Sequence, residues 1–339
     1  MYNLWPLRNR EIATIYRSLI SLSLLLTLLT VVLSAYIRLA EVGIGCEEWP
    51  ACYAQLNAGV EQQGITVLTE EGRDMAHYGA RVAHRYIASV LGLFIVGIFI
   101  IALRQGRARA TTFLVPLAIF GITVFLSLLG YYTPTRSNPL ITMGNLLGGM
   151  ALLGLLWWLM QRESGAVEVS ADSSGFRPLA LFAVCLVLLQ IVLGGWSSAN
   201  YASASCPGLV SCEGDILATS KLADAFNPLR SITLDEEGQV VRTDSLGLLS
   251  MAHRLFALFT AAYLAWLVRR LRPQSPLHGT LLALSILSIS QIVVGITSIW
   301  LELPLVLVTL HNALAAGLLL GSVNLLHRLT PATGSPPLG

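Results

Sequence analysis

The stretch LISLSLLLTLLTVVLSAYI (Leu19–Ile37) decides the fold class, because its 19 residues include no charged side chain. About 20 apolar residues are enough for an α-helix to cross a bilayer. Seven more stretches share this length and apolar character: Val82–Leu103, Thr111–Tyr132, Leu140–Met160, Leu179–Trp196, Leu248–Val268, Gly279–Trp300 and Leu305–Leu326. The sequence therefore predicts eight transmembrane helices.

The overall composition agrees with this interpretation. Of the 339 residues, 55% are hydrophobic and only 12% are charged, and the mean hydropathy is +0.69. Soluble domains average about 25% charged residues, so a water-soluble enzyme is excluded. The net charge of +2 and the absence of a basic run argue against a nucleic-acid partner. A polytopic protein of the lipid bilayer remains.

The basic residues indicate the direction in which the chain crosses the membrane. Arginines gather before the first predicted helix, after the last, and in the connections that follow the second, fourth and sixth helices. Most carboxylates lie in the other connections, of which two are long, at about 39–80 and 199–246. Because cytoplasmic loops are enriched in Lys and Arg, we expect both termini to face the cytoplasm.

Three kinds of motif occur once in each half of the chain. They are a His-Arg pair, two cysteines with five residues between them, and a polar residue near the start of a predicted helix. The copies are His84-Arg85 and His253-Arg254, Cys46/Cys52 and Cys206/Cys212, and Asn145 and His311. The copies are 169, 160 and 166 residues apart, which indicates an internal duplication of four helices.

We therefore predict an all-α integral membrane protein whose eight transmembrane helices form two tandem, pseudo-symmetric four-helix bundles. Since an even number of helices separates the copies, the two halves are related by an axis along the membrane normal. We place the first bundle in residues 1–162, a cytoplasmic linker in 163–177 and the second bundle in 178–339.

The second half carries two histidines at matched depth, near the outer ends of the sixth and eighth predicted helices. Two imidazoles that face each other across a bundle suit axial ligation of heme iron, so we predict that His253 and His311 bind it. Arg254 could pair with a heme propionate. The alternative is a buried histidine whose partner is a serine or a carbonyl. The chain contains no HExxH motif for zinc and no CxxCH motif for c-type heme.

The first half repeats this arrangement with one change. His84 matches His253, but Asn145 stands where His311 would have its counterpart. An axial ligand opposite an open or weakly filled face is what an exchangeable substrate needs, and a degenerate, inactive site would have the same sequence. His77, seven residues before His84, could serve as a second ligand or as a proton carrier, or could be a surface residue.

The paired cysteines all fall on the predicted outer side, which is an oxidising environment. We expect two local disulfides, Cys46–Cys52 and Cys206–Cys212, each closing a short loop above its bundle. Such a loop could be a simple staple, or it could pass reducing equivalents by thiol–disulfide exchange.

These residues resemble the heme A synthase family, the membrane enzymes of cytochrome oxidase assembly. The resemblance covers about residues 15–328. The matching stretches are GCEEWPACY (45–53), HRYIASVLG (84–92), NLLGG (145–149), QIVLGGW (190–196), AHR (252–254) and VTLH (308–311).

The resemblance implies a division of labour between the halves. The second half would hold heme b through His253 and His311. The first half would bind heme O as its substrate and oxidise a porphyrin methyl group, through the alcohol, to the formyl group of heme A with oxygen from water. It further implies a bacterial cytoplasmic (inner) membrane location. Expected partners are the heme O synthase (protoheme farnesyltransferase) and oxidase assembly factors, and a homo-oligomer is left open.

Two positions of the first half depart from the family pattern. The family usually has His at the position of Asn145, and Glu rather than Arg81 three residues before His84. We expect His84, Asn145 and Arg81 to form the catalytic site and Arg85 to contact the cofactor. Because arginine cannot accept a proton at neutral pH, two other interpretations stay open. They are a non-catalytic heme-binding relative that acts in oxidase assembly or heme delivery, and a b-type electron-transfer cytochrome. A secondary transporter is disfavoured because the helices are not interrupted at mid-membrane.

Overall fold

The computed structural model describes residues 5–41, 71–104, 110–132, 139–164, 175–212, 220–230 and 243–331, and all regular structure within them is helical. The long helices are α1 (Trp5–Glu41), α3 (Glu71–Arg104), α4 (Ala110–Tyr132), α5 (Pro139–Glu163), α6 (Arg177–Ala199), α8 (Asp244–Leu271), α9 (His278–Trp300) and α10 (Leu305–Arg328). In the described ranges, eight helical segments are long and apolar enough to cross a membrane. The predicted all-α, multi-pass membrane fold is confirmed.

The outer surfaces of these helices are apolar, as a lipid environment requires. Large side chains such as Leu93, Leu258 and Ile289 are more than 60% exposed. Exposed patches of this kind are rare on soluble proteins but are favourable against acyl chains. Polar backbone groups are satisfied within each helix, which allows the chain to cross the hydrocarbon layer.

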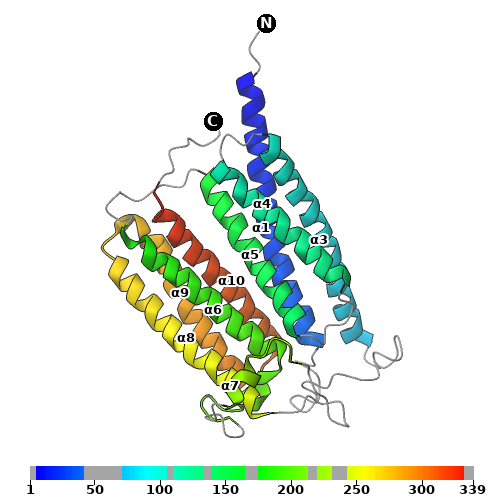
Figure 1. The fold of residues 1–339 in the computed structure, drawn as a ribbon, viewed down its shortest axis with the longest axis vertical. Coiled ribbons are helices and arrows are strands. Elements are labelled where there is room, and N and C mark those ends of the chain that lie inside the picture. Colours follow the sequence, from blue (N-terminus) through cyan, green and yellow to red (C-terminus); the bar gives the residue numbers. More distant parts are fainter. Residues whose placement is uncertain are drawn as a thin grey trace.

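The first four long helices form one bundle (Figure 1). Contacts run from α1 to α3, from α3 to α4, from α4 to α5 and back from α5 to α1, so α3 lies diagonally opposite α5. The interior is a cluster of buried aliphatic side chains that includes Ile20, Ile95, Ile119 and Leu156. His84 of α3 and Asn145 of α5 therefore lie on diagonally opposite helices.

The last four long helices form a second bundle with the same order of contacts. Contacts run from α6 to α8, α9 and α10 in turn and back to α6, so α8 lies diagonally opposite α10. Since α1, α3, α4 and α5 follow each other around the first ring as α6, α8, α9 and α10 do around the second, the two rings correspond helix by helix. This correspondence agrees with the duplication seen in the sequence.

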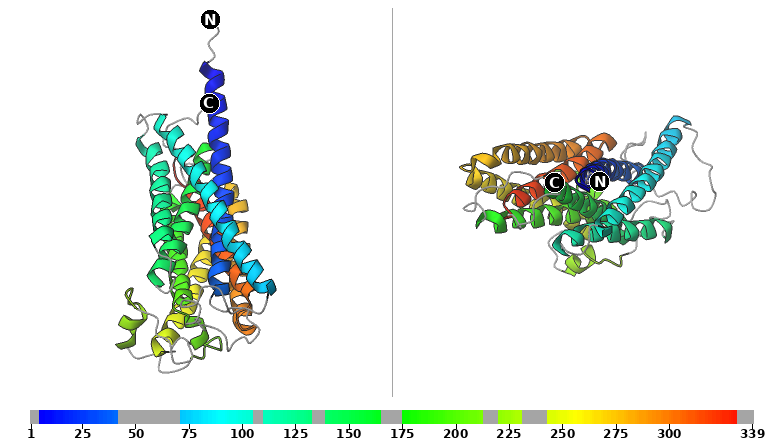
Figure 2. Two further views of the ribbon diagram at one scale, coloured as in Figure 1. Left: turned by 90° about the vertical axis from the view of Figure 1, so that its right-hand side faces the viewer. Right: turned by 90° about the horizontal axis from the view of Figure 1, so that it is seen from above.

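The two bundles lie side by side and share a core. Helices α1 and α5 contact α10, and α5 also contacts α6 (Figures 1 and 2). One cluster of buried side chains joins Met150 and Leu153 of α5 to Val187 of α6 and Leu319 of α10. The N-terminal end of α1 and the C-terminal end of α10 lie at the same end of the molecule (Figure 1).

A small layer outside the long helices covers the opposite end of the second bundle. It contains the 3-10 helix η3 (Ala202–Ser205) and the short helix α7 (Ser220–Ala225). The indole nitrogen of Trp196, near the end of α6, donates a 2.8 Å hydrogen bond to the carbonyl oxygen of Ala225. Arg230 donates to the hydroxyls of Thr243 and Ser245 at the start of α8. This layer is therefore fixed to the ends of α6 and α8.

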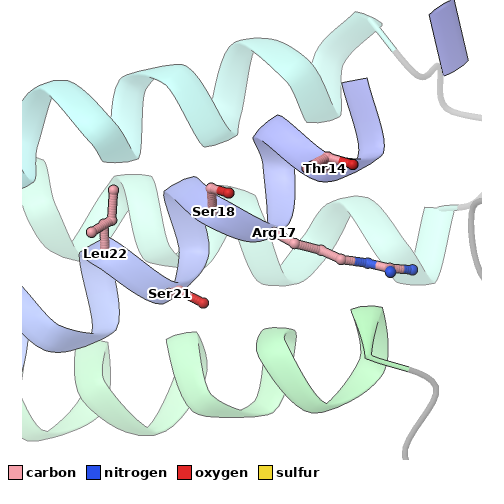
Figure 3. A pocket seen from close by; sticks show the side chains of 5 residues that line it. All are labelled: Thr14, Arg17, Ser18, Ser21 and Leu22. Atoms are coloured by element: carbon pink, nitrogen blue, oxygen red, sulfur yellow. The ribbon is translucent and has the colours of Figure 1, made fainter. Parts of the chain in front are cut away.

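The exposed face near the N-terminal end of α1 contains an open groove. Its lining side chains all come from this helix, as Figure 3 shows: Thr14, Arg17, Ser18, Ser21 and Leu22. The groove lies toward the end of the molecule away from η3 and α7, whereas His253 lies near the η3 end. It is therefore separate from the site described next.

Candidate heme site

The two histidines of the second bundle lie on diagonally opposite helices. His253 is in the third turn of α8, and His311 is in the second turn of α10. Both side chains are half-buried. The structure thus places the two residues that the sequence predicts as axial ligands on opposite helices of one bundle.

His253 packs against helix α6. The side-chain nitrogen Nε2 of Gln190 lies 3.0 Å from Nδ1 of His253 and donates a 3.2 Å hydrogen bond to the His253 carbonyl oxygen. One turn later, a Cβ placed on Gly194 would come within 2.7 Å of Cε1 of the imidazole. Only glycine at this position leaves room for the ring beside α6.

His311 packs against helix α9 in a similar way. Nε2 of Gln291 lies 3.1 Å from Nε2 of His311. A Cβ on Gly295, again one turn later, would lie 3.1 Å from Cε1 of His311. The other ring nitrogen, Nδ1, is buried and has no hydrogen-bond partner in the described part of the chain.

Three buried polar atoms of this cluster lack a partner among the described residues: Nδ1 of His311 and the side-chain oxygens Oε1 of Gln190 and Gln291. Buried polar atoms are almost always hydrogen-bonded, so unpaired ones require an explanation. Imidazole nitrogens on facing helices are also the donor set that heme iron accepts. The residues of the second bundle therefore fit a heme group.

Arg254, next to His253, contacts the loop that follows η3. Its guanidinium donates to the carbonyl oxygens of Cys206, Gly208 and Leu209, at 2.9 Å and 3.0 Å for Cys206 and Leu209. The loop is thereby tied to α8 directly beside the histidine. Pairing of Arg254 with a heme propionate stays a prediction.

The same loop carries the disulfide between Cys206 and Cys212, which confirms one of the two expected pairings. Cys46 and Cys52 lie outside the described residues, so the first-half pairing stays a prediction.

The first-half residues lie at corresponding places. His84 is half-buried on α3, flanked by the exposed Arg81 and Arg85, and Asn145 is exposed on the diagonally opposite α5. His77 falls within α3, but its side chain lies outside the described residues. The catalytic roles given to this set stay predictions.

The surroundings of Asn145 differ from those of His311. In the second bundle a glycine of α9 makes room for the His311 ring of α10. In the first bundle two glycines of α5 pack closely against α4: a Cβ on Gly144 would lie 2.9 Å from Leu129 and one on Gly148 2.6 Å from Leu126. Leucines of α4 thus occupy space beside α5, so the two halves are not equivalent around these positions.

The two remaining histidines of the described second half, His278 and His327, lie at helix ends. Nε2 of His278 lies 2.8 Å from the carbonyl oxygen of Arg272, and His327 packs edge-on against Trp158 at 5.0 Å between ring centroids. Both lie at the end of the molecule away from η3, as expected for residues without a ligand role.

Sequence reasoning missed Gln190 and Gln291 as partners of the histidines. A signal for both was present, because QIVLG at 190–194 and QIVVG at 291–295 are nearly the same motif. Its meaning depends on which helices flank each histidine, and that order is known only from the fold.

Comparison with known proteins identifies the family. The family described as "Cytochrome oxidase assembly protein" matches residues 17–323. A heme A synthase from Shewanella oneidensis is 33% identical over 314 residues, which cover 91% of this chain and 94% of the relative. The chain belongs to the heme A synthase family. Membership of the heme A synthase family identifies it as a multi-pass membrane oxidoreductase.

Proposed function

We propose that this chain is a heme A synthase, which oxidises a methyl group of heme O to the formyl group of heme A. One observation carries the proposal: His253 and His311 lie on diagonally opposite helices of one bundle, each beside a glycine that makes room for its ring. The relative from Shewanella oneidensis supports the same reaction.

In the second half, His253 and His311 would hold heme b. A bound heme b supplies one-electron redox chemistry, so it could take up electrons removed from the substrate. The chain's own contribution is to fix two imidazoles on facing helices. Arg254 and the disulfide loop would shield this outer face from water, because they cover the end of α8 next to His253.

In the first half, His84 would bind the substrate iron, and Arg85 would contact a propionate. Asn145 can donate a hydrogen bond to water or to a substrate group, but it is a poor iron ligand. Arg81 cannot act as the proton acceptor. The oxidation also requires water as the oxygen source, an acceptor for the released protons, and an external electron acceptor that reoxidises heme b after each electron it takes up. We assign the water-binding role to Asn145.

The protein would work in the bacterial cytoplasmic (inner) membrane with both termini in the cytoplasm. The arginine-rich connections support this orientation. Its partners would be a heme O synthase, which supplies the substrate, and oxidase assembly factors, which receive the product.

Co-expression with a heme O synthase, followed by pigment extraction, tests the reaction. We expect heme A in extracts of cells with the intact chain, and heme O without heme A in cells that lack it. Unchanged heme O beside intact heme b would instead favour the non-catalytic heme-binding relative.

A second experiment tests the ligand assignment. His253→Ala and His311→Ala should each abolish the low-spin heme spectrum of the purified protein, because a bis-histidine site cannot form with one imidazole. His278→Ala, at the other end of the molecule, is the matched control and should keep the spectrum. If both ligand variants retain a wild-type spectrum, heme b is held elsewhere.

A further inference from the structure

We propose that Gln190 and Gln291 are positioning residues, each of which sets the orientation and hydrogen bonding of one heme-binding imidazole. This inference rests on the proposed heme site at His253 and His311. It concerns two residues that do not themselves bind iron.

The first observation is the recurrence of one motif on two helices. QIVLG (190–194) lies on α6 and QIVVG (291–295) lies on α9, and these helices occupy the other diagonal of the second ring. In each copy the glutamine contacts a ring nitrogen and the glycine, one turn later, lies against the same ring. Each histidine is therefore held at two points by one helix.

The second observation is that burial of these glutamines has a cost. A primary amide within an apolar span is unfavourable unless both its oxygen and its nitrogen are hydrogen-bonded. The oxygens Oε1 of Gln190 and Gln291 are buried without a partner in the described structure. Each amide nitrogen, in contrast, lies within hydrogen-bonding distance of a histidine ring nitrogen. The contact with the imidazole is the feature that accounts for a glutamine in both places.

The two contacts use different ring nitrogens, which gives the residues different roles. Gln190 lies at Nδ1 of His253, so Nε2 of that ring is left for iron. A metal-bound histidine normally donates its other N–H to an acceptor, which makes the ring a stronger electron donor. Rotation of the Gln190 amide, with loss of its hydrogen bond to the His253 carbonyl oxygen, would bring the amide oxygen to Nδ1 as this acceptor.

Gln291 lies at Nε2 of His311 and leaves Nδ1 buried and unpartnered. It therefore holds the ring by one nitrogen, while the other lies beside Gly295 of α9. Removing Gln291 should change the angle of the His311 ring rather than the electron density on His253.

The test uses the full-length protein purified with its bound heme. Gln190→Leu should retain low-spin heme but shift the midpoint potential upward, because the imidazole loses its acceptor and stabilises ferric iron less well. Gln190→Glu, which supplies a stronger acceptor, should shift the potential downward. Gln291→Leu should change the low-temperature electron paramagnetic resonance spectrum, which reports the relative orientation of the two rings.

Gln161→Leu is the matched control, because Gln161 is a glutamine of α5 that hydrogen-bonds Asn324 instead of a histidine. Its potential and spectrum should equal those of the unmodified protein. If Gln190→Leu does not accumulate in cells, the midpoint potential of Gln190→Glu tests the role of Gln190. If Gln291→Leu does not accumulate, the spectrum of Gln291→Asn tests the role of Gln291.

Wild-type potentials and spectra in the variants of both glutamines would overturn the positioning role while leaving the heme site intact. Failure of the proposed function would give a different experimental result. In that case the unmodified protein lacks bis-histidine heme, or keeps its spectrum after loss of His253 and His311.

Discussion

At the scale of single residues, the site depends on glycines that leave room for the histidine rings. The imidazole of His253 occupies the position that a side chain at 194 would fill, since a Cβ there would lie 2.7 Å from Cε1 and 3.2 Å from Nδ1. A ring in this place cannot move away easily, because Gln190 contacts it one turn earlier.

We therefore predict that Gly194→Ala weakens heme binding. The added methyl group forces the His253 ring to shift, and overpacking of this kind costs about 1–3 kcal/mol. Thermal unfolding in detergent, followed by heme absorbance, should show earlier heme release than in the unmodified protein.

Gly121→Ala is the control for this change. Gly121 lies within α4, and a Cβ there meets nothing within 4 Å. Alanine is the better helix former by roughly 0.5–1 kcal/mol, so this variant should be at least as stable as the unmodified protein. Equal heme release from both variants would show that the space beside Gly194 is unimportant.

Part of the site could be predicted from the sequence. An ionisable residue within an apolar span indicates function, and this rule predicts His253 and His311 as ligands. Their partners could not be predicted, because a glutamine on α6 or α9 contacts a histidine only when the order of the helices around the ring brings them together.

At the scale of elements, most helices were predicted to within a few residues, and the largest differences are at polar ends. The apolar stretch predicts 19–37 for the first helix, whereas α1 runs over Trp5–Glu41. Hydropathy detects only the part of a helix that lies in lipid. Arg and Glu are good helix formers, so the helix continues past the apolar stretch in both directions.

The contact of Arg254 with the disulfide loop is an element-scale feature that the sequence did not indicate. A guanidinium is a fork of several donors, and here it joins α8 to carbonyls at three positions of one loop. The disulfide between Cys206 and Cys212 closes the same loop. Two independent restraints therefore hold this segment beside His253.

We predict that Arg254→Met loosens the loop without unfolding the bundle. Loss of charge-assisted hydrogen bonds worth about 1.5 kcal/mol corresponds to about tenfold more frequent local opening. Hydrogen exchange measured by mass spectrometry should be faster in residues 206–212 and unchanged in α10.

Arg270→Met serves for comparison, because Arg270 lies over the Phe176 ring at the other end of α8. It should leave exchange in the loop at the level of the unmodified protein. Faster exchange in Arg270→Met, or unchanged exchange in Arg254→Met, would contradict the assigned restraint.

At the scale of the whole molecule, corresponding helices of the two halves contact each other at both ends. Arg38 of α1 donates to the hydroxyl of Ser198 of α6, 160 residues later, which is also the spacing between the cysteine pairs. At the other end, Gln161 of α5 contacts Asn324 of α10, three residues before the position that the spacing of Asn145 and His311 makes equivalent. Helices related by a two-fold axis can meet only near that axis, so these contacts support a pseudo-two-fold axis between the bundles.

Around its candidate site, however, the duplication is unequal. The second half has two histidines with glutamine and glycine partners, while the first has His84, Asn145 and leucines of α4 beside the glycines of α5. The difference is consistent with one half holding a resident group and the other admitting a substrate that must leave.

Substitutions at two positions of the first half test this inequality. Asn145→His combined with Arg81→Glu would give the first half a second imidazole on the helix opposite His84, and a carboxylate one turn before His84 that can accept a proton. A positioned general base contributes about 10²–10⁴-fold in rate, so even partial placement should raise conversion several-fold. The measurement is the ratio of heme A to heme O in extracts of cells that also express a heme O synthase. The single variants separate the two effects, since Arg81→Glu supplies the base and Asn145→His only the ligand. An unchanged ratio in the double variant would mean that the first half relies on groups other than the residues at 81 and 145.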